Sequence, residues 1–308
     1  MFPYIHPLIL PLGFFFCTNS FVGVIGNAIM LMCYFKNKRL RSPCHILITL
    51  SCLSDLMHLT AQFIWGYYLF SDKTNTVAQC FYRMAIPLIG VTAAGPLILA
   101  MGIDRLIAVK FPTKYRLYTQ EPRSYVMCHL IFPAVYIAMC LAYGYQTKLD
   151  KVQITCAVPL GLWGAAFQFF TYTSALIYAL VVIVYLTVYI LLKSSSASAR
   201  FKSVFKSISV TVGLVVFGWV TTTVANTLSY EVTSDEFIAI VIQMYAGITV
   251  NLAAASNIFV FYSINSEYRE VIKSLLGLKN KTKTANFEAS SANTVSVMRV
   301  HPNRRTTV

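Results

Sequence analysis

Asp104 and Arg105 are an adjacent acid and base at the end of an uncharged run, residues 84–103. A charged side chain is costly inside lipid, but it is tolerated at a membrane–water boundary beside an opposite charge. The chemistry that such a pair offers is electrostatic, because the acid can hold the guanidinium in place. Lys110, Pro112 and Tyr115 follow the pair. The stretch therefore predicts a membrane helix that reaches water and turns there.

A further acid, Asp55, lies inside an apolar segment that carries no other charge between residues 42 and 71. An ionisable side chain at membrane depth is by default a functional-site hypothesis. Ser51 lies one helical turn before Asp55 and on the same helix face. Asn27, in the first apolar segment, should likewise face the helix bundle and form hydrogen bonds there.

Membrane helices must position these residues, as the composition indicates. Of 308 residues, 57% are hydrophobic and 12% are charged, whereas about a quarter of a soluble domain is charged. A helix crosses the bilayer core with about 20 mostly apolar residues. Seven segments are long enough: about 8–34, 44–70, 78–104, 124–146, 165–192, 207–230 and 237–262. The sequence predicts an all-α membrane protein, a seven-transmembrane helix bundle that occupies residues 1–277.

The segment after the seventh span predicts a short amphipathic eighth helix over residues 264–277. At helical spacing Tyr268, Ile272 and Leu275 share one face, which suits a helix lying on the membrane surface. The tail, residues 278–308, is polar, basic and rich in Ser and Thr, so it is expected to be disordered. Its last residues, Thr306, Thr307 and Val308, fit a ligand that adds a strand to a PDZ domain, although so short a match also arises by chance.

The net charge of +14 is unevenly distributed along the chain. If the N-terminus lies outside, only Lys73, Arg83, Lys148 and Lys151 of the 25 basic residues fall on the outer side. An excess of Lys and Arg on the cytoplasmic side is what the positive-inside rule requires. The basic balance therefore indicates membrane topology and some attraction to anionic lipid of the bilayer, and not a nucleic-acid partner.

The block around Asp104 resembles the pattern Asp-Arg-Tyr-x-Ala-Ile-x-x-Pro-Leu-x-Tyr of rhodopsin-like G-protein-coupled receptors. Gly26-Asn27, Asp55, Trp219 and Asn257 follow the order of that family. Residues 44–48, 54–58, 103–112 and 266–269 look like the nematode serpentine chemoreceptors of class SX. The resemblance implies coupling or switch roles for a set of residues: Asn27, Asp55, Asp104, Arg105, Val109, Pro112, Thr113, Tyr115, Asn257 and Tyr262.

What the resemblance implies is a plasma-membrane receptor with its N-terminus outside, in sensory neurons. It would bind a small odorant-like or peptide ligand and activate a heterotrimeric G protein. In that family the carboxylate at Asp55 binds sodium or water. Ala94 stands where the family often supplies a serine, so a sodium ion, a water and a protonated carboxyl remain open at Asp55.

Several family positions are replaced, which keeps two other functions open. Gly218 and Thr221 stand for the Cys and Pro around Trp219, and Ile258 and Phe261 stand for the Pro and Tyr after Asn257. A receptor fold that has lost coupling is one alternative, and a transporter or channel is the other. No acid occurs between residues 193 and 230, so Asp104 must hold Arg105 in the resting state, and we expect a weakly locked receptor with basal signalling.

A disulfide is expected between Cys80 and Cys156. The other six cysteines fall within or beside the predicted spans, where a thiol behaves as a small apolar side chain. Cys80 and Cys156 lie in the predicted outer regions, which fold in an oxidising compartment. The bond would tie the second outer loop to the start of the third span. Cys80 also precedes Arg105 by the separation typical of the family.

The ligand is expected among aromatic and polar residues near the outer ends of the helices. Arg83 would hold a ligand anion or extend its charge to the interface, and the aromatic start of the fifth span is a ligand wall or an interfacial belt. Pro87 stands where amine receptors place an acid. No metal-ligand cluster or catalytic triad is evident, so neither a cofactor nor an enzyme is expected. The ligand candidates are Trp65, Tyr68, Tyr82, Arg83, Phe167, Gln168, Tyr172, Trp219, Asn226, Gln243 and Tyr245.

Overall fold

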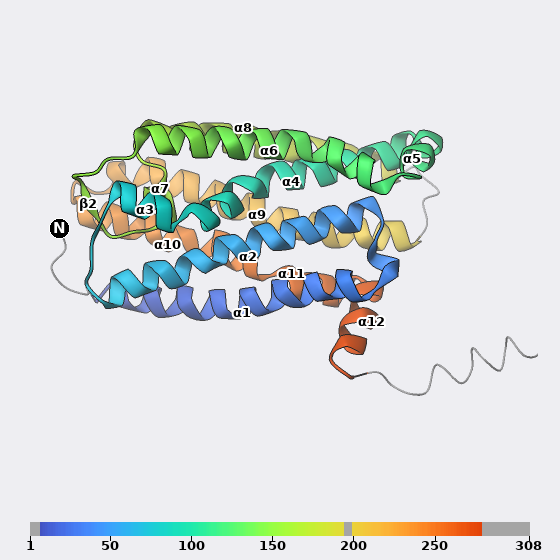
Figure 1. The fold of residues 1–308 in the computed structure, drawn as a ribbon, viewed down its shortest axis with the longest axis horizontal. Coiled ribbons are helices and arrows are strands. Elements are labelled where there is room, and N and C mark those ends of the chain that lie inside the picture. Colours follow the sequence, from blue (N-terminus) through green and yellow to red (C-terminus); the bar gives the residue numbers. More distant parts are fainter. Residues whose placement is uncertain (1–6, 194–198, 279–308) are drawn as a thin grey trace, which may run out of the picture.

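The computed structural model describes residues 7–193 and 199–278. Seven helices in this part of the chain are long and apolar enough to cross a membrane. They pack side by side along the long axis of the molecule (Figure 1), which confirms the predicted seven-helix architecture. They are α1 (Leu10–Lys36), α2 (Pro43–Phe70), α4 (Ala85–Lys110), α6 (Pro122–Thr147), α8 (Ala165–Lys193), α9 (Ala199–Val232) and α10 (Glu236–Ala255).

Shorter elements connect these helices at the two ends of the bundle. One end carries the two-stranded antiparallel sheet, and the other carries α5 and α12 (Figure 1). The predicted tail, from residue 279 on, and the PDZ-type end at Thr306 lie outside the described residues. The short elements are η1 (Lys38–Leu40), β1 (Asn75–Thr76), α3 (Val77–Arg83), α5 (Pro112–Tyr118), β2 (Gln153–Ile154), α7 (Val158–Gly161), α11 (Asn257–Ile264) and α12 (Ser266–Leu275).

The third span differs from the predicted segment 78–104, because two helices occupy this region. α3 ends at Arg83, and α4 begins at Ala85 and continues to Lys110. In an unbroken helix residue 87 would donate its backbone N–H to the Arg83 carbonyl, but Pro87 has no N–H. At the other end Phe111 leaves the helical conformation with φ −131° and ψ 61°, as a residue before a proline tends to do.

The seventh span is also divided, although no proline lies at the break. α10 ends at Ala255, and α11 begins at Asn257. Between them the Ser256 backbone N–H donates to the Ala253 carbonyl at 3.1 Å, and the Ser256 hydroxyl donates to the same oxygen at 2.7 Å. This tighter i to i−3 bonding interrupts the α-helical ladder.

α4 is the central helix of the bundle. Every residue from 90 to 102 is buried, and α4 packs against α2, α6 and α8. At Gly90 an added Cβ would lie 2.5 Å from the Ser54 carbonyl oxygen of α2, so only glycine allows this close approach. The Ser54 hydroxyl donates to the Gly90 carbonyl at 2.7 Å. This contact fixes the position of α4 against α2, and with it the position of Asp104 and Arg105 at the end of α4.

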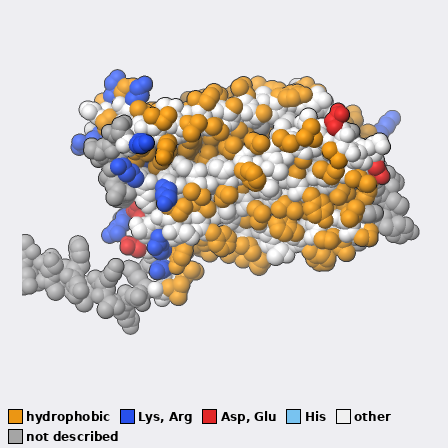
Figure 2. All heavy atoms as spheres, turned by 180° about the vertical axis from the view of Figure 1, so that it is seen from behind, with side chains coloured by type: hydrophobic (Ala, Val, Ile, Leu, Met, Phe, Trp, Pro, Cys, Tyr) orange, Lys and Arg blue, Asp and Glu red, His pale blue; other side chains and the backbone are white. Residues whose placement is uncertain are grey.

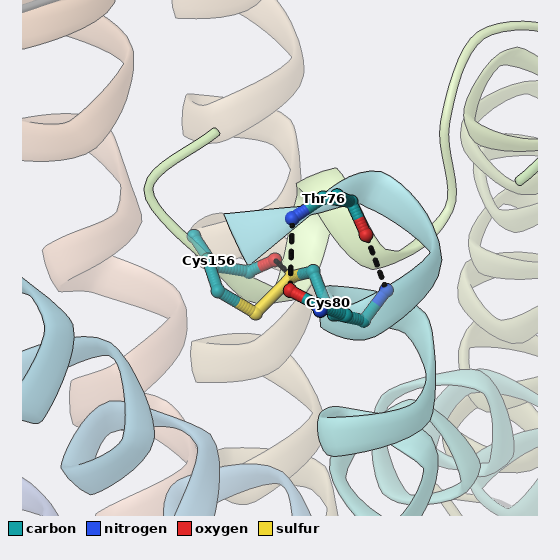
Figure 3. Close-up of a disulfide and its surroundings, with 5 residues drawn as sticks. Thr76, Cys80 and Cys156 are labelled. Carbon is teal, nitrogen blue, oxygen red and sulfur yellow. Dashed lines mark hydrogen bonds between the residues drawn. A yellow bond between two sulfur atoms is a disulfide. The ribbon is translucent and has the colours of Figure 1, made fainter. Parts of the chain in front are cut away.

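The end of the bundle that holds the sheet is covered by the loop between α6 and α8. The Cys80–Cys156 disulfide, which the sequence predicts, joins this loop to α3 (Figure 3). Thr76 caps α3, because its hydroxyl accepts a hydrogen bond from the Gln79 backbone N–H at 3.1 Å. Leu162, beyond α7, is 2% exposed. We call this end of the molecule the disulfide end.

Lys and Arg side chains gather at the opposite end, which we call the Arg105 end (Figure 2). Hydrophobic side chains cover the long face between the two ends in the same view. α12 folds against the Arg105 end with Tyr268, Val271 and Ile272 buried. Asn265 caps α12, because its side-chain oxygen accepts from the Glu267 backbone N–H at 2.9 Å. Charged ends and an apolar girdle are what a membrane-spanning bundle requires.

Candidate functional site

Arg105 is held by Asp104 and Tyr115 at one end of α4. The Arg105 Nε donates to Asp104 Oδ2 at 2.8 Å, and its Nη2 donates to the Tyr115 hydroxyl at 3.0 Å. Arg105 is 5% exposed, and Asp104 is fully buried. Removing one partner of a buried ion pair leaves an uncompensated charge, which is costly. We call Asp104, Arg105 and Tyr115 the clasp. The Arg105 guanidinium leaves these partners only when another group takes their place.

Aromatic rings from two other elements close around the guanidinium. The Arg105 guanidinium carbon lies 4.8 Å from the Phe201 ring centroid on α9 and 6.0 Å from that of Tyr115 on α5. Burial, followed by the charge of Asp104, raises the pKa of Tyr115, while the charge of Arg105 opposes this shift. Tyr115 therefore stays a neutral hydroxyl that accepts the hydrogen bond from Arg105.

Two polar atoms of this cluster are left without hydrogen-bond partners. Asp104 Oδ1 and the Tyr125 hydroxyl are both buried and find no partner in residues 7–193 and 199–278. Tyr125 packs edge-on against Tyr115, with ring centroids 5.9 Å apart. A buried unsatisfied polar atom costs about 1–3 kcal/mol. One oxygen of the Asp104 carboxylate therefore makes no hydrogen bond of good geometry with a described residue, although Tyr125 lies close enough to Asp104 to feel its charge.

Asn27, Asp55 and Asn257 meet in the middle of the bundle, although they lie far apart in the sequence. The Asn257 side-chain amide donates to Asp55 Oδ2 at 2.7 Å and to Asn27 Oδ1 at 2.8 Å. The Asn27 amide donates in turn to the Ala254 carbonyl at 3.0 Å. These bonds join α1, α2 and α11 to the end of α10. A cavity of about 20 Å³ beside them is lined by Ser51, Asp55 and Asn257 among others.

Tyr262 does not take part in this network. It is partly exposed, and its backbone oxygen accepts from Arg269 Nε at 2.8 Å. Phe261 is buried instead, with its ring centroid 4.9 Å from that of Tyr268. The Tyr268 hydroxyl lies 3.2 Å from His45 Nδ1 on α2, and burial raises its pKa well above the usual value. Sequence reasoning placed Tyr268 on the apolar face of a helix lying on the membrane surface and missed its contact with His45.

The remaining coupling candidates, Val109, Pro112 and Thr113, lie on a largely exposed surface next to the clasp. Pro112 and Thr113 are exposed at the start of α5, whereas Val109 is half-buried. Phe111 and Leu117 add exposed apolar side chains on the same short segment. The predicted coupling residues are therefore divided between a buried clasp, a central network and an accessible surface.

The predicted ligand residues fall into separate groups of contacts. Trp65 packs edge-on against Phe16 of α1, with ring centroids 5.6 Å apart. The Arg83 guanidinium lies 5.2 Å from the ring centroid of the buried Tyr68. Trp219 of α9 stacks on Tyr178 of α8 at 5.4 Å. Each of these groups joins a different pair of elements.

The other ligand candidates form hydrogen bonds within the protein or are exposed. Gln243 Nε2 donates to the Ser229 hydroxyl at 2.7 Å, and the Ser229 hydroxyl donates to the Asn226 carbonyl at 3.4 Å. The Tyr245 hydroxyl donates to the Leu8 carbonyl at 2.8 Å. The side chains of Tyr82 and Tyr172 are 57% and 73% exposed. Gln168 is also exposed, and Phe167 is half-buried.

The family model described as "Serpentine type 7TM GPCR chemoreceptor Srsx" matches residues 20–276 of this chain. The chain is similar to Mas-related G-protein coupled receptor member A6 of Mus musculus, with 25% identity over 64% of this chain and 63% of the relative. It is also similar to olfactory receptor 5M11 of Homo sapiens, with 28% identity over 39% of each chain. A third match, C-C chemokine receptor type 4 of Homo sapiens, is 29% identical over 28% of this chain and 24% of the relative.

The chain spans less than two thirds of the length of each of these relatives, from 24% to 63%.

Proposed function

Because this chain belongs to the Srsx family of serpentine seven-transmembrane GPCR chemoreceptors, we propose that it detects a chemosensory ligand and activates a heterotrimeric G protein. It is a multi-pass membrane receptor and not an enzyme. The proposed ligand is a small odorant-like molecule or a peptide. The proposed location is the plasma membrane of sensory neurons, with the N-terminus and the disulfide end outside. The basic Arg105 end supports this orientation through the positive-inside rule.

The proposed mechanism is a shift between two arrangements of the bundle. A ligand that binds the active arrangement better shifts the population by its differential affinity and no more. Of the ligand candidates, Trp219 is the best placed to transmit this shift, because it stacks on Tyr178 between α8 and α9. The network of Asn27, Asp55 and Asn257 lies further along the bundle toward the clasp at Arg105.

The observation that carries this proposal is the clasp itself. Arg105 is buried against Asp104 and Tyr115, and the contact from α9 is the uncharged ring of Phe201. Since no acid occurs between residues 193 and 230, α9 adds no ion pair to the clasp. A small movement of α9 would then uncover the guanidinium for the G protein, and we expect basal signalling because no ion pair with the clasp holds α9 in place.

At Asp55 we propose a contact through water. A site of about 20 Å³ has room for one water molecule, whereas a sodium ion needs a shell of oxygen ligands. Ala94 of α4 brings no oxygen. The PDZ-type end at Thr306 and Val308 stays a prediction, and a partner pull-down with the last residue removed is its test.

The test of the proposed function is G-protein recruitment in cells that express the full chain. We expect recruitment above the level of untransfected cells, and its loss in Arg105→Ala. Arg123→Ala, a charge change on α6 outside the clasp, is the matched control and should retain recruitment. Surface expression without recruitment of any G-protein class would favour a fold that has lost coupling. Ion current or solute uptake without recruitment would favour a transporter or channel.

A further inference from the structure

A groove of about 380 Å³ runs along the half of α9 nearest the disulfide end. Its volume falls within the range of small-molecule sites. Its outer wall consists of side chains one helical turn apart, which are between 49% and 74% exposed. Surface that a membrane-spanning helix leaves uncovered faces lipid, so the groove opens toward the bilayer. The wall residues are Val220, Val224, Leu228 and Val232.

The groove exists because α9 presents small side chains to α10. Thr221, Ala225 and Ser229 form its floor, and Ile242 of α10 lies opposite. One turn closer to the Arg105 end the helices touch, since a Cβ added to Gly218 would lie 2.9 Å from the Val250 backbone nitrogen. The groove therefore begins where this backbone contact ends.

The polar atoms of the floor differ in what they can still bind. Ser229 already accepts from Gln243 and donates to the Asn226 carbonyl. The Thr221 hydroxyl donates to the Phe217 carbonyl at 2.9 Å and keeps lone pairs that can accept another hydrogen bond. None of the described residues that line the groove is charged. The groove thus offers an apolar wall and, at the end nearest Gly218, the Thr221 hydroxyl as a hydrogen-bond acceptor.

Packed side chains of the covering loop close part of the disulfide end. Cys156 and Leu162 of the covering loop are buried. Ala157 of the same loop packs against a cluster that contains Phe16, Trp65 and Val241. These contacts cover part of the disulfide end, whereas the groove in α9 is open to lipid.

We propose that this groove binds an aliphatic alcohol dissolved in the bilayer, with its alkyl chain along the valine–leucine wall and its hydroxyl donating to Thr221 Oγ1. A phospholipid acyl chain fits less well, because it carries no hydrogen-bond donor for Thr221 Oγ1. The groove begins next to Trp219, which gives an occupant access to the proposed switch. Its role as the activating ligand rests on the proposed function, but its binding does not.

The experiment is photolabelling of the full-length receptor in phosphatidylcholine nanodiscs with a diazirine derivative of octanol. Labelled peptides are identified by mass spectrometry, so that no G protein is needed. We expect labelling of residues 220–232 that octanol displaces about fivefold better than octane, the value of one neutral hydrogen bond. Thr221→Val should abolish this preference without changing the shape of the groove.

Ala225→Trp fills the floor of the groove and should reduce labelling about tenfold, as expected for loss of the site. Leu214→Trp, an exposed position on the same helix outside the groove, is the matched control and should label normally. Equal labelling in all variants overturns the proposal. The proposal is also overturned if a diazirine derivative of phosphatidylcholine labels the same peptides and octanol does not displace it. Normal displacement in a receptor that recruits no G protein would instead overturn the proposed function alone.

Discussion

The Arg105 guanidinium donates a hydrogen bond to the Tyr115 hydroxyl at 3.0 Å, which links the end of α4 to the short helix α5. Tyr115 stands ten positions further along the chain, and Phe111 and Pro112 turn the chain between them. The α5 segment therefore serves two purposes. Its half-buried Tyr115 holds the guanidinium, and its exposed residues form the adjoining surface.

Tyr115→Phe should raise basal signalling about threefold. The change removes one hydrogen bond to a charged donor, worth about 1.5–3 kcal/mol, and the effect on signalling is smaller because the bond from Arg105 to Asp104 remains. Basal second-messenger level per receptor at the cell surface is the measurement. Tyr118→Phe, on the exposed side of the same helix, should leave the level unchanged. Equal basal levels in the two variants would show that Tyr115 does not restrain Arg105.

Cys156→Ala should lower both surface expression and thermal stability. The bond closes a loop across a sequence separation of 76 residues, and a disulfide stabilises a protein by about 2–4 kcal/mol. Its loss would also free the loop that covers the disulfide end. The measurement is thermal denaturation of the detergent-solubilised receptor, with the accessibility of its free thiols as the readout. Cys128→Ala, which changes an exposed free cysteine, should melt as the parent does.

Asn27→Ala and Asn257→Ala should be coupled in their effects on stability. The Asn257 amide donates to both Asn27 and Asp55, so its removal leaves two acceptors without their donor. Side-chain hydrogen bonds inside a membrane bundle average about 0.6 kcal/mol and reach about 1.7 kcal/mol. A double-mutant cycle in melting experiments should give a coupling energy in that range. Strictly additive effects would mean that the two amides act independently.

The sequence predicts the helices well because lipid imposes one simple requirement on them. A run of about 20 apolar residues crosses the bilayer only as a helix, and this requirement locates all seven spans. It does not locate their ends. α9 begins at Ala199, before the apolar run, because Lys202 and Lys206 can extend a helix into water. Sequence reasoning therefore missed the contact between Phe201 and Arg105.

The central network and the ligand candidates differ in how far sequence alone could place them. Asn27, Asp55 and Asn257 carry polar groups at membrane depth, where each needs a partner, so their meeting could be anticipated. The candidates near the disulfide end lie in a zone where aromatic side chains also favour the interface. Composition cannot distinguish these two roles there, and the outward direction of Tyr172 depends on the rotation of α8.

Gly218→Ala should destabilise the receptor, whereas Gly213→Ala in the same helix should not. A Cβ at Gly218 would lie 2.9 Å from the Val250 nitrogen and 3.0 Å from the Thr249 carbonyl carbon. These are backbone atoms, so the two helices must separate, and overpacking of this kind costs about 1–3 kcal/mol. At Gly213 an added Cβ meets nothing within 4 Å, and replacing glycine in a helix gains about 0.5–1 kcal/mol.

The measurement is thermal unfolding of each purified variant, with basal G-protein recruitment alongside. Gly218→Ala should melt below the parent and recruit more G protein without ligand, because separation at this contact is the movement that α9 needs to free Arg105. Gly213→Ala should melt at or above the parent temperature with unchanged recruitment. A Gly218→Ala receptor that melts normally would mean that α9 and α10 do not touch at this point. Normal recruitment despite a lower melting temperature would separate the contact from the switch.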